Sequence, residues 1–201
     1  MTLKTDNSSN IKLLLLSLLT SLDLLASSGL YLEAGAGLGY ESEIETKNNN
    51  YIYEKNYIAI AAIGYQYDAF RFELEGRYKK DSLYSSNYTQ DNISVNGDLT
   101  HESKMVNIYY SGYNSSKLVS SIGFGVGVTD IKLKNLIELN TAQIDIIDTN
   151  ILSYQGMFSV GYMLSHHFTI TTKYTYFQTS DSDSFDSSGD STLSLSLRYL
   201  F

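Results

Sequence analysis

The sequence predicts an all-β protein, an eight-stranded antiparallel β-barrel that crosses a membrane. Three observations lead to this fold class. Apolar and polar residues alternate along eight segments, short and long polar connections follow one another between them, and glycines gather on the polar side of two of them. Side chains of a strand point to alternate faces of a sheet, so alternation with a period of two is typical of strands.

The amino-terminal residues have the layout of a secretory signal peptide. Lys4 and Lys12 precede the apolar run 13–22, and small residues follow it, so that cleavage is expected after Ala26 or Ser28. The alternative is an uncleaved anchor. It is disfavoured because Asp23 interrupts the apolar run, which falls short of the ~20 residues of a spanning helix. We expect a signal peptide at 1–28 and one barrel domain at 29–201.

The alternating segments of the barrel domain are expected to form its strands. The clearest places Phe70, Phe72 and Leu74 against Arg71 and Glu73, whereas the second is ambiguous because both of its faces are apolar near the start. Most of the segments approach the ~9–11 residues that a tilted membrane-crossing strand needs. In order, the expected strands are 30–40, 57–67, 70–78, 106–111, 118–129, 152–162, 168–176 and 191–201.

The chain ends on an aromatic residue that closes an alternating apolar series. The series is Leu193, Leu195, Leu197, Tyr199 and Phe201. It resembles the terminal strand of bacterial outer-membrane β-barrels, in which a C-terminal phenylalanine is the signal for the barrel assembly machinery. The whole chain resembles the small OmpA-like, OmpX-like and opacity-protein (surface-antigen) barrels. The resemblance implies an outer-membrane monomer with membrane lipid and the assembly machinery as partners.

The connections between the expected strands alternate in length. Tight turns are predicted near 68–69, 114–116 and 165–167, and longer polar stretches at 41–56, 79–103, 130–150 and 178–190. This alternation is typical of a barrel with short periplasmic turns and long outer loops. An even number of strands then places both termini in the periplasm.

Charged residues decide which face of the strands points inward. An Arg that faces lipid near the midplane costs ~2–4 kcal/mol, so the charged phase of segment 70–78 is expected to face the lumen. Acids and bases in this phase are nearly balanced, which favours a structural ion-pair network over a proton path. The expected network consists of Glu33, Arg71, Glu73, Glu75, Arg77, Lys173 and Arg198.

A soluble lipocalin-like ligand-binding barrel, with its apolar face turned inward, is the alternative fold. Its polar face would carry alternating glycines at 35–39 and 123–127, which weaken a water-facing strand but make room inside a tight lumen. Seven tyrosines near the strand ends of the apolar face suit an aromatic girdle at a membrane interface: Tyr40, Tyr57, Tyr65, Tyr67, Tyr78, Tyr162 and Tyr176. The transmembrane barrel is therefore the favoured interpretation.

Composition and motifs point away from several functions. The net charge of −8 disfavours nucleic-acid binding, and the absence of cysteine excludes thiol chemistry. His166 and His167 fall in a short turn, and His101 falls in a predicted solvated loop, so we expect no catalytic residues and no cofactor. The acidic stretch 181–190 lacks the spacing of a calcium loop and is expected to be a solvated loop without bound metal.

The expected function is therefore that of a non-enzymatic outer-membrane surface protein. Its role would be structural, or would involve a host or other extracellular ligand that meets the long loops, since binding residues concentrate on loops held by a rigid scaffold. The alternative is a narrow ion-conducting, porin-like channel. Eight strands enclose a lumen that side chains just fill, so a wide pore is excluded.

Overall fold

The computed structural model describes residues 28–41, 44–46, 49–86, 97–113, 117–136, 144–182 and 187–201. The predicted signal peptide, except for its last residue, lies outside the described residues. In the part of the chain that the structure describes, no helix is long and apolar enough to span a bilayer. The strands are β1 (Gly29–Glu41), β2 (Ile44–Thr46), β3 (Asn49–Tyr67), β4 (Phe70–Ser86), β5 (Gly97–Tyr113), β6 (Leu118–Leu136), β7 (Ile144–Met163), β8 (Phe168–Thr179) and β9 (Gly189–Leu200).

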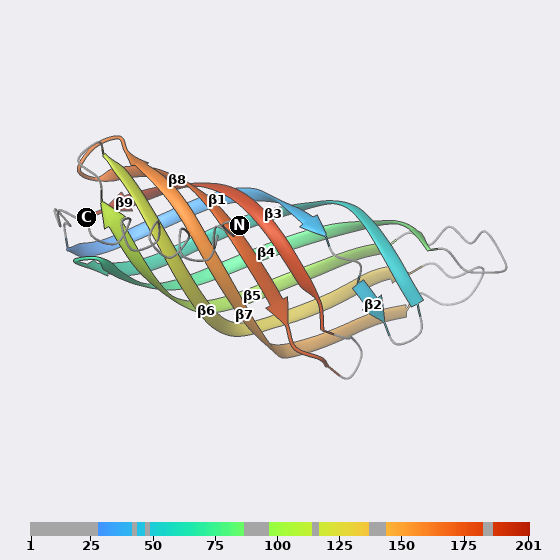
Figure 1. The fold of residues 1–201 in the computed structure, drawn as a ribbon. Coiled ribbons are helices and arrows are strands. Elements are labelled where there is room, and N and C mark those ends of the chain that lie inside the picture. Colours follow the sequence, from blue (N-terminus) through green and yellow to red (C-terminus); the bar gives the residue numbers. More distant parts are fainter. Residues whose placement is uncertain are drawn as a thin grey trace, which may run out of the picture.

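Eight of these strands close into a barrel (Figure 1). Neighbouring strands are antiparallel, and β1 closes the barrel by pairing with both β9 and β3. The three-residue β2 pairs only with the start of β3 and extends one edge. The predicted fold class, an eight-stranded antiparallel barrel, is confirmed.

The register of the strands fixes their tilt. A circuit of directly paired residues that begins at Phe70 passes through Tyr110, Ile122, Phe158, Tyr174, Leu193 and Leu38 and ends at Tyr57. Since Phe70 also pairs with Tyr67, one turn around the barrel advances by 67 − 57 = 10 residues. A stagger of this size in eight strands corresponds to a tilt of roughly 40°. Each row of directly paired residues therefore rises along the barrel axis as it passes from β4 through β5 to β9 and β1.

The two ends of the barrel differ, and we name them the short-turn end and the extended end. At the short-turn end, β3 and β4 are joined by the turn Asp68–Ala69, in which Asp68 has a φ of 55°. Aspartate is one of the few residues besides glycine that tolerate this left-handed conformation in turns. Residues 164–167 join β7 and β8 at the same end. The predicted turn 114–116 lies outside the described residues.

The strands are longer than predicted toward the extended end, which corrects the expected loop boundaries. β4 continues to Ser86 and β5 starts at Gly97, so most of the predicted loop 79–103 is a β-ladder. The stretches 41–56, 130–150 and 178–190 are likewise partly strand. Beyond the membrane both faces of a strand can meet water, so the backbone ladder continues while the alternation that marks a strand in the sequence fades.

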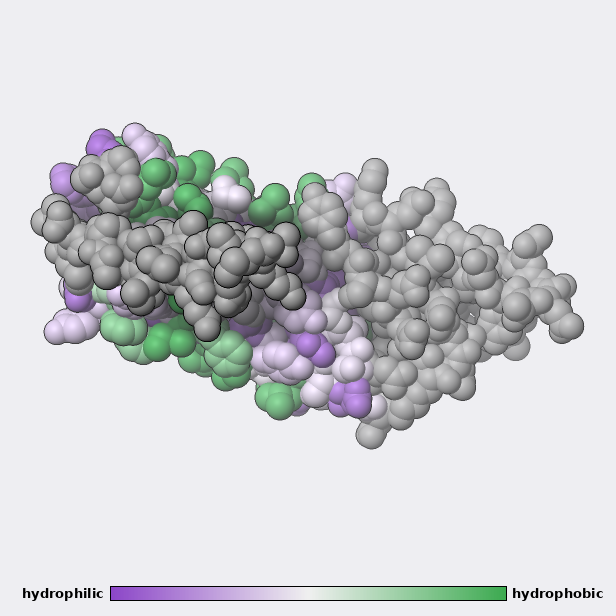
Figure 2. Space-filling model, in the orientation of Figure 1, coloured by the Kyte–Doolittle hydropathy of each residue, from purple (hydrophilic) through white to green (hydrophobic). Residues whose placement is uncertain are grey.

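Apolar side chains cover the outside of the barrel next to the short-turn end, and we call this surface the apolar belt. On β4 it comprises the outward positions from Phe70 to Tyr78, and Lys80 follows them. Figure 2 shows hydrophobic residues gathered over this part of the barrel and hydrophilic residues beyond it. At ~3.3 Å per residue and this tilt, eight residues rise by about 20 Å, close to the ~25 Å of a membrane barrel's apolar band.

The structure settles the facing of the ambiguous strand. On β3 the larger Ile58 and Ile60 point into the lumen, whereas Ala59 and Ala61 face outward. Six of the tyrosines expected in the girdles face outward; the side chain of the seventh, Tyr40, lies outside the described residues. These six are Tyr57, Tyr65, Tyr67, Tyr78, Tyr162 and Tyr176.

Candidate functional site

The lumen near the short-turn end is built around Arg71 of β4. Its guanidinium lies 3.9 Å from the carboxylate of Glu33 and 4.4 Å from the ring centre of Tyr109. Glu33 also accepts a hydrogen bond of 2.8 Å from Ser196. Arg198 lies over the ring of Tyr31 at 5.5 Å, and no ion pair is recorded for it within the described residues. Cations and aromatic rings thus share this part of the lumen.

Lys173 of β8 occupies the middle of the lumen. Its ammonium donates to Glu75 of β4 at 3.1 Å and lies 3.8 Å from Glu33. In the circular order of the eight strands, β8 and β4 are four places apart and face each other across the barrel. The Lys173–Glu75 pair therefore crosses the lumen from wall to wall.

Neutral polar groups complete the centre. Glu73 accepts hydrogen bonds from the hydroxyl of Tyr31 at 2.8 Å and from the amide of Asn107 at 3.0 Å. The amide of Gln155 on β7 donates to Asn107 at 2.9 Å and to Glu75 at 3.2 Å. These bonds supply partners for carboxylates that would be costly to bury alone.

Glycines on the lumen face make room for the large central side chains. A Cβ at Gly123 would collide with the ring of Tyr109, and a Cβ at Gly64 would collide with Tyr31. Glycine in a strand often marks such a close approach. The glycines therefore lie where large side chains fill the lumen, as expected from the sequence.

At the edge of the belt and beyond it, a second charged cluster lies on the inner wall toward the extended end. Arg77 donates to Thr192 at 2.6 Å and lies 3.3 Å from Asp190. Lys79 donates to Asp190 at 2.8 Å and lies 3.5 Å from Asp81. The Nε2 atom of His101 is 3.5 Å from the Asp81 carboxylate. We call Arg77, Lys79, Asp81, His101 and Asp190 the upper cluster.

Two predictions from the sequence are corrected in the upper cluster. His101 is not in a solvated loop; it lies on β5 with only 6% of its surface exposed. Asp190 does not belong to a solvated acidic loop, because it is the second residue of β9 and is paired with two cations. Residues 183–186 of that stretch lie outside the described residues.

Burial shifts the pKa of two residues of the upper cluster, His101 and Asp81. The pKa of His101 is lowered to about 3, mainly by burial and then by the charge of Lys79. The pKa of Asp81 is raised to about 6 by burial and by Asp190, against the opposing effect of Lys79. At neutral pH the histidine is therefore neutral and the aspartate is ionised.

We expect His101→Asn to reduce the acid sensitivity of the barrel. In the unfolded chain a histidine takes up a proton near pH 6.5, whereas in the native barrel it resists protonation down to about pH 3, so stability is lost as the pH falls between these values. Asp81, whose pKa is raised, changes the stability in the opposite direction as the pH falls, but it is present in both the wild type and the variant. Thermal unfolding in detergent at about pH 6.5 and about pH 5 measures the difference. The same substitution at the exposed His166 is the control; equal acid sensitivity of His101→Asn and wild type would contradict the account.

All seven predicted lumen residues lie buried inside the barrel. Five of them form ion pairs, Glu73 is held by neutral donors, and Arg198 contacts an aromatic ring. The sequence prediction missed Lys79 and Asp81, although both continue the phase of Arg77 on the same strand. It also missed the neutral partners, Tyr31, Asn107, Tyr109 and Gln155.

The terminal apolar series lies on the outside of β9. Leu193, Leu195, Leu197 and Tyr199 face outward, and Phe201 follows the strand with 66% of its surface exposed. The ring of Tyr199 packs against Phe201 at 5.0 Å and against Phe168 at 5.0 Å. These side chains belong to the apolar belt at the short-turn end.

Within the described ranges, no three His, Asp or Glu side chains are arranged to hold a metal ion. The carboxylate of Asp81 lies 3.5 Å from His101 and 3.5 Å from Lys79. Such an arrangement stabilises the interior and sets the facing of the strands.

The fold matches solved outer-membrane barrels. Neisserial surface protein A shares 15% identity, with 88% of this chain and 100% of that chain covered and a TM-score of 0.62. OprG from Pseudomonas aeruginosa shares 12% identity over 87% and 96% of the two chains, with a TM-score of 0.54. The attachment invasion locus protein of Yersinia pestis, in complex with the heparin analogue sucrose octasulfate, shares 11% identity over 88% and 100%, with a TM-score of 0.50. No protein-family model and no curated protein sequence matches the chain.

Proposed function

We propose that this chain is a non-enzymatic outer-membrane surface protein that presents its extended end to the cell exterior. The observation that carries the proposal is the Lys173–Glu75 pair, which crosses the lumen at 3.1 Å inside a barrel with an apolar outer belt. A barrel whose lumen is filled by side chains from opposite walls is a rigid scaffold. The segments that it holds above the membrane are what a partner can reach.

The orientation is part of the proposal. Short turns and both ends of the barrel domain are proposed to lie in the periplasm, and the extended ends of the long strands β3 to β7 outside, as is typical of outer-membrane barrels. The partners that follow are membrane lipid, the barrel assembly machinery acting on β9, and an extracellular partner at the extended end. We propose a monomer, because closure of the sheet leaves no long edge strand.

An attachment role is supported by a neighbour of the same fold. The attachment invasion locus protein of Yersinia pestis carries that role in its name and was crystallised with a heparin analogue. The narrow channel is disfavoured, because side chains from opposite walls meet in the lumen. The lipocalin arrangement is disfavoured by the inward charges and the outward apolar belt.

Shortened hairpins at the extended end test the attachment role. Leu83 already pairs with Gly97, and Leu136 pairs with Ile144, so an Asn-Gly turn after each pair closes a shorter hairpin. We expect the shortened protein to fold and to lose adhesion of expressing cells to heparin-coated or matrix-coated surfaces. The control is an Asn-Gly turn in place of Asp68–Ala69 at the opposite end. Undiminished adhesion of the shortened protein would contradict the attachment role. If neither the shortened protein nor the control adheres, the structural role remains.

A further inference from the structure

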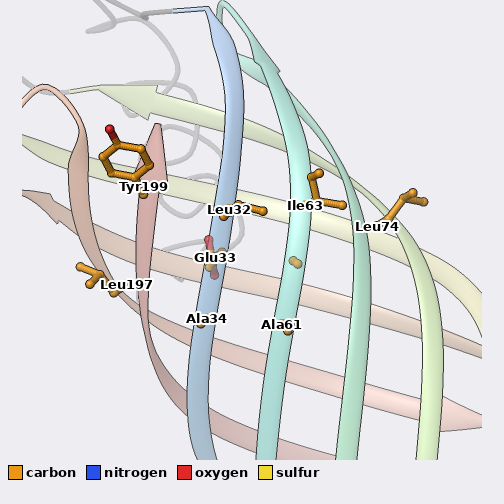
Figure 3. Close-up of a pocket in the computed structure, with 9 residues that line it drawn as sticks. Leu32, Glu33, Ala34, Ala61, Ile63, Leu74, Leu197 and Tyr199 are labelled. Carbon is orange, nitrogen blue, oxygen red and sulfur yellow. The ribbon is translucent and has the colours of Figure 1, made fainter. Parts of the chain in front are cut away.

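Two adjoining depressions mark the outer surface of the barrel across β9, β1, β3, β4 and β5. The first, of about 570 Å³, is lined by outward side chains that include Leu197, Ala34 and Ala61 (Figure 3). The second, of about 390 Å³, is lined by Ala61 as well and extends to Gly76 and Lys104. Ala61 lines both, so the two depressions adjoin, and together we call them the outer groove.

Side-chain size creates the outer groove. Ala34 pairs directly with Ala61, and Ala61 pairs with Gly76, so three small residues lie in one row on three adjacent strands. The next row toward the short-turn end is Leu32, Ile63 and Leu74. Their larger side chains border the depression (Figure 3). A Cβ added at Gly76 would meet no atom closer than 3.8 Å, so the groove is open there.

The groove ends at a lysine. Lys104 of β5 pairs with Gly76 on one side and Val128 on the other, and its side chain is exposed on the lipid-facing surface next to Val106. Among the described residues no hydrogen bond or ion pair is recorded for it. The two nearby outward carboxylates are already engaged: Glu102 accepts from Lys132 at 2.7 Å, and Asp130 accepts from the backbone of Asn150 at 2.9 Å.

Lys104 also lies at the depth of a lipid head group. It is 113 − 104 = 9 residues from Tyr113, the end of β5 at the short-turn end. At ~3.3 Å per residue and a tilt of roughly 40°, the rise is about 23 Å, which is the far edge of an apolar band of ~25 Å. The stagger makes the row Leu197–Ala34–Ala61–Gly76–Lys104 climb toward this edge.

We propose that the outer groove binds a membrane lipid with an anionic phosphate head group. One acyl chain lies over Ala34, Ala61 and Gly76, and the phosphate rests on the ammonium of Lys104. The charge supports this occupant, because an exposed lysine at the edge of the belt needs an anion that the neighbouring carboxylates do not supply. The inference requires only that the barrel is embedded in a bilayer, and it is independent of which end faces outward.

Native mass spectrometry of the barrel released from detergent micelles tests the head-group contact. Phosphatidylglycerol and phosphatidylcholine with identical acyl chains are added at equal concentration, and we expect preferential retention of phosphatidylglycerol. A basic side chain near an anionic membrane contributes ~1 kcal/mol, so Lys104→Gln should reduce phosphatidylglycerol retention by about fivefold. Lys117→Gln, at the short-turn end, is the control and should retain the preference.

A second pair of variants tests the acyl contact. Ala61→Phe fills the groove and is expected to abolish retention of phosphatidylglycerol, whereas Val126→Phe, a lipid-facing residue on β6, should not. Faster migration on unheated gels than after boiling verifies that each variant is folded. Retention of phosphatidylglycerol that survives both Lys104→Gln and Ala61→Phe would overturn the proposal. A lipid-free dimer that Ala61→Phe dissociates would also overturn it, since a second copy of the chain would then occupy the groove.

Discussion

Replacing Lys173 by methionine is expected to lower the free energy of unfolding by ~3–5 kcal/mol, because it removes the cation that is paired with the buried carboxylate of Glu75. Lys173 is 3% exposed and lies within 3.8 Å of Glu33 as well as 3.1 Å from Glu75. Methionine has a similar length, so the change removes the charge with little change in packing. Urea-induced unfolding of the barrel in lipid vesicles measures the loss.

The matched control is Lys132→Met. Lys132 forms a shorter ion pair, 2.7 Å from Glu102, but the two side chains are 29% and 43% exposed. Exposed pairs contribute little because water screens them, so the control should unfold nearly as the wild type does. Equal losses for the two variants would show that Lys173 does not hold the opposite walls of the lumen together.

Leu74→Arg is expected to destabilise the barrel by ~2–4 kcal/mol, the cost of placing a guanidinium near the midplane of the membrane. Leu74 is 60% exposed on the outside of β4, four residues above Phe70, and therefore lies near the middle of the apolar belt. The same unfolding measurement in vesicles detects the change.

Thr100→Arg provides the control for the lipid-facing side. Thr100 also points outward, but it lies on β5 beyond Lys104 and so outside the apolar belt. It should tolerate arginine with almost no change in stability. If Leu74→Arg unfolds at the same urea concentration as the wild type, the outward facing of this strand surface is wrong.

The barrel could be predicted from the sequence because membrane and lumen impose opposite polarities on adjacent residues. Arg71 and Glu73 alternate with Phe70 and Phe72 for this reason, and the alternation fixes the facing of the strand. Ile58 and Ile60 could not be placed in this way, because both faces of their strand are apolar. Register settled the matter, since it places Ala61 between Ala34 and Gly76 on the outside.

The candidate site was predictable only in part. Periodicity placed the seven charged residues of the lumen, because each occupies a position of the inward phase. It could not show that Lys173 meets Glu75, since these residues lie on opposite walls and 173 − 75 = 98 positions apart. It also failed at His101, because beyond the belt a buried histidine and a solvated one have the same polar neighbours in sequence.

Cysteine labelling of intact cells tests the central claim most directly. The chain contains no cysteine, so single cysteines report on single positions. We predict that Thr100→Cys, at the extended end, reacts on intact cells with a polyethylene-glycol maleimide too large to enter the periplasm. His166→Cys, at the short-turn end, should react only after the outer membrane is opened. A chain that carries Thr100→Cys but lacks Phe201 should stay unlabelled on intact cells, because it fails to assemble. Labelling of His166→Cys on intact cells with protection of Thr100→Cys would contradict the proposed orientation and the function built on it.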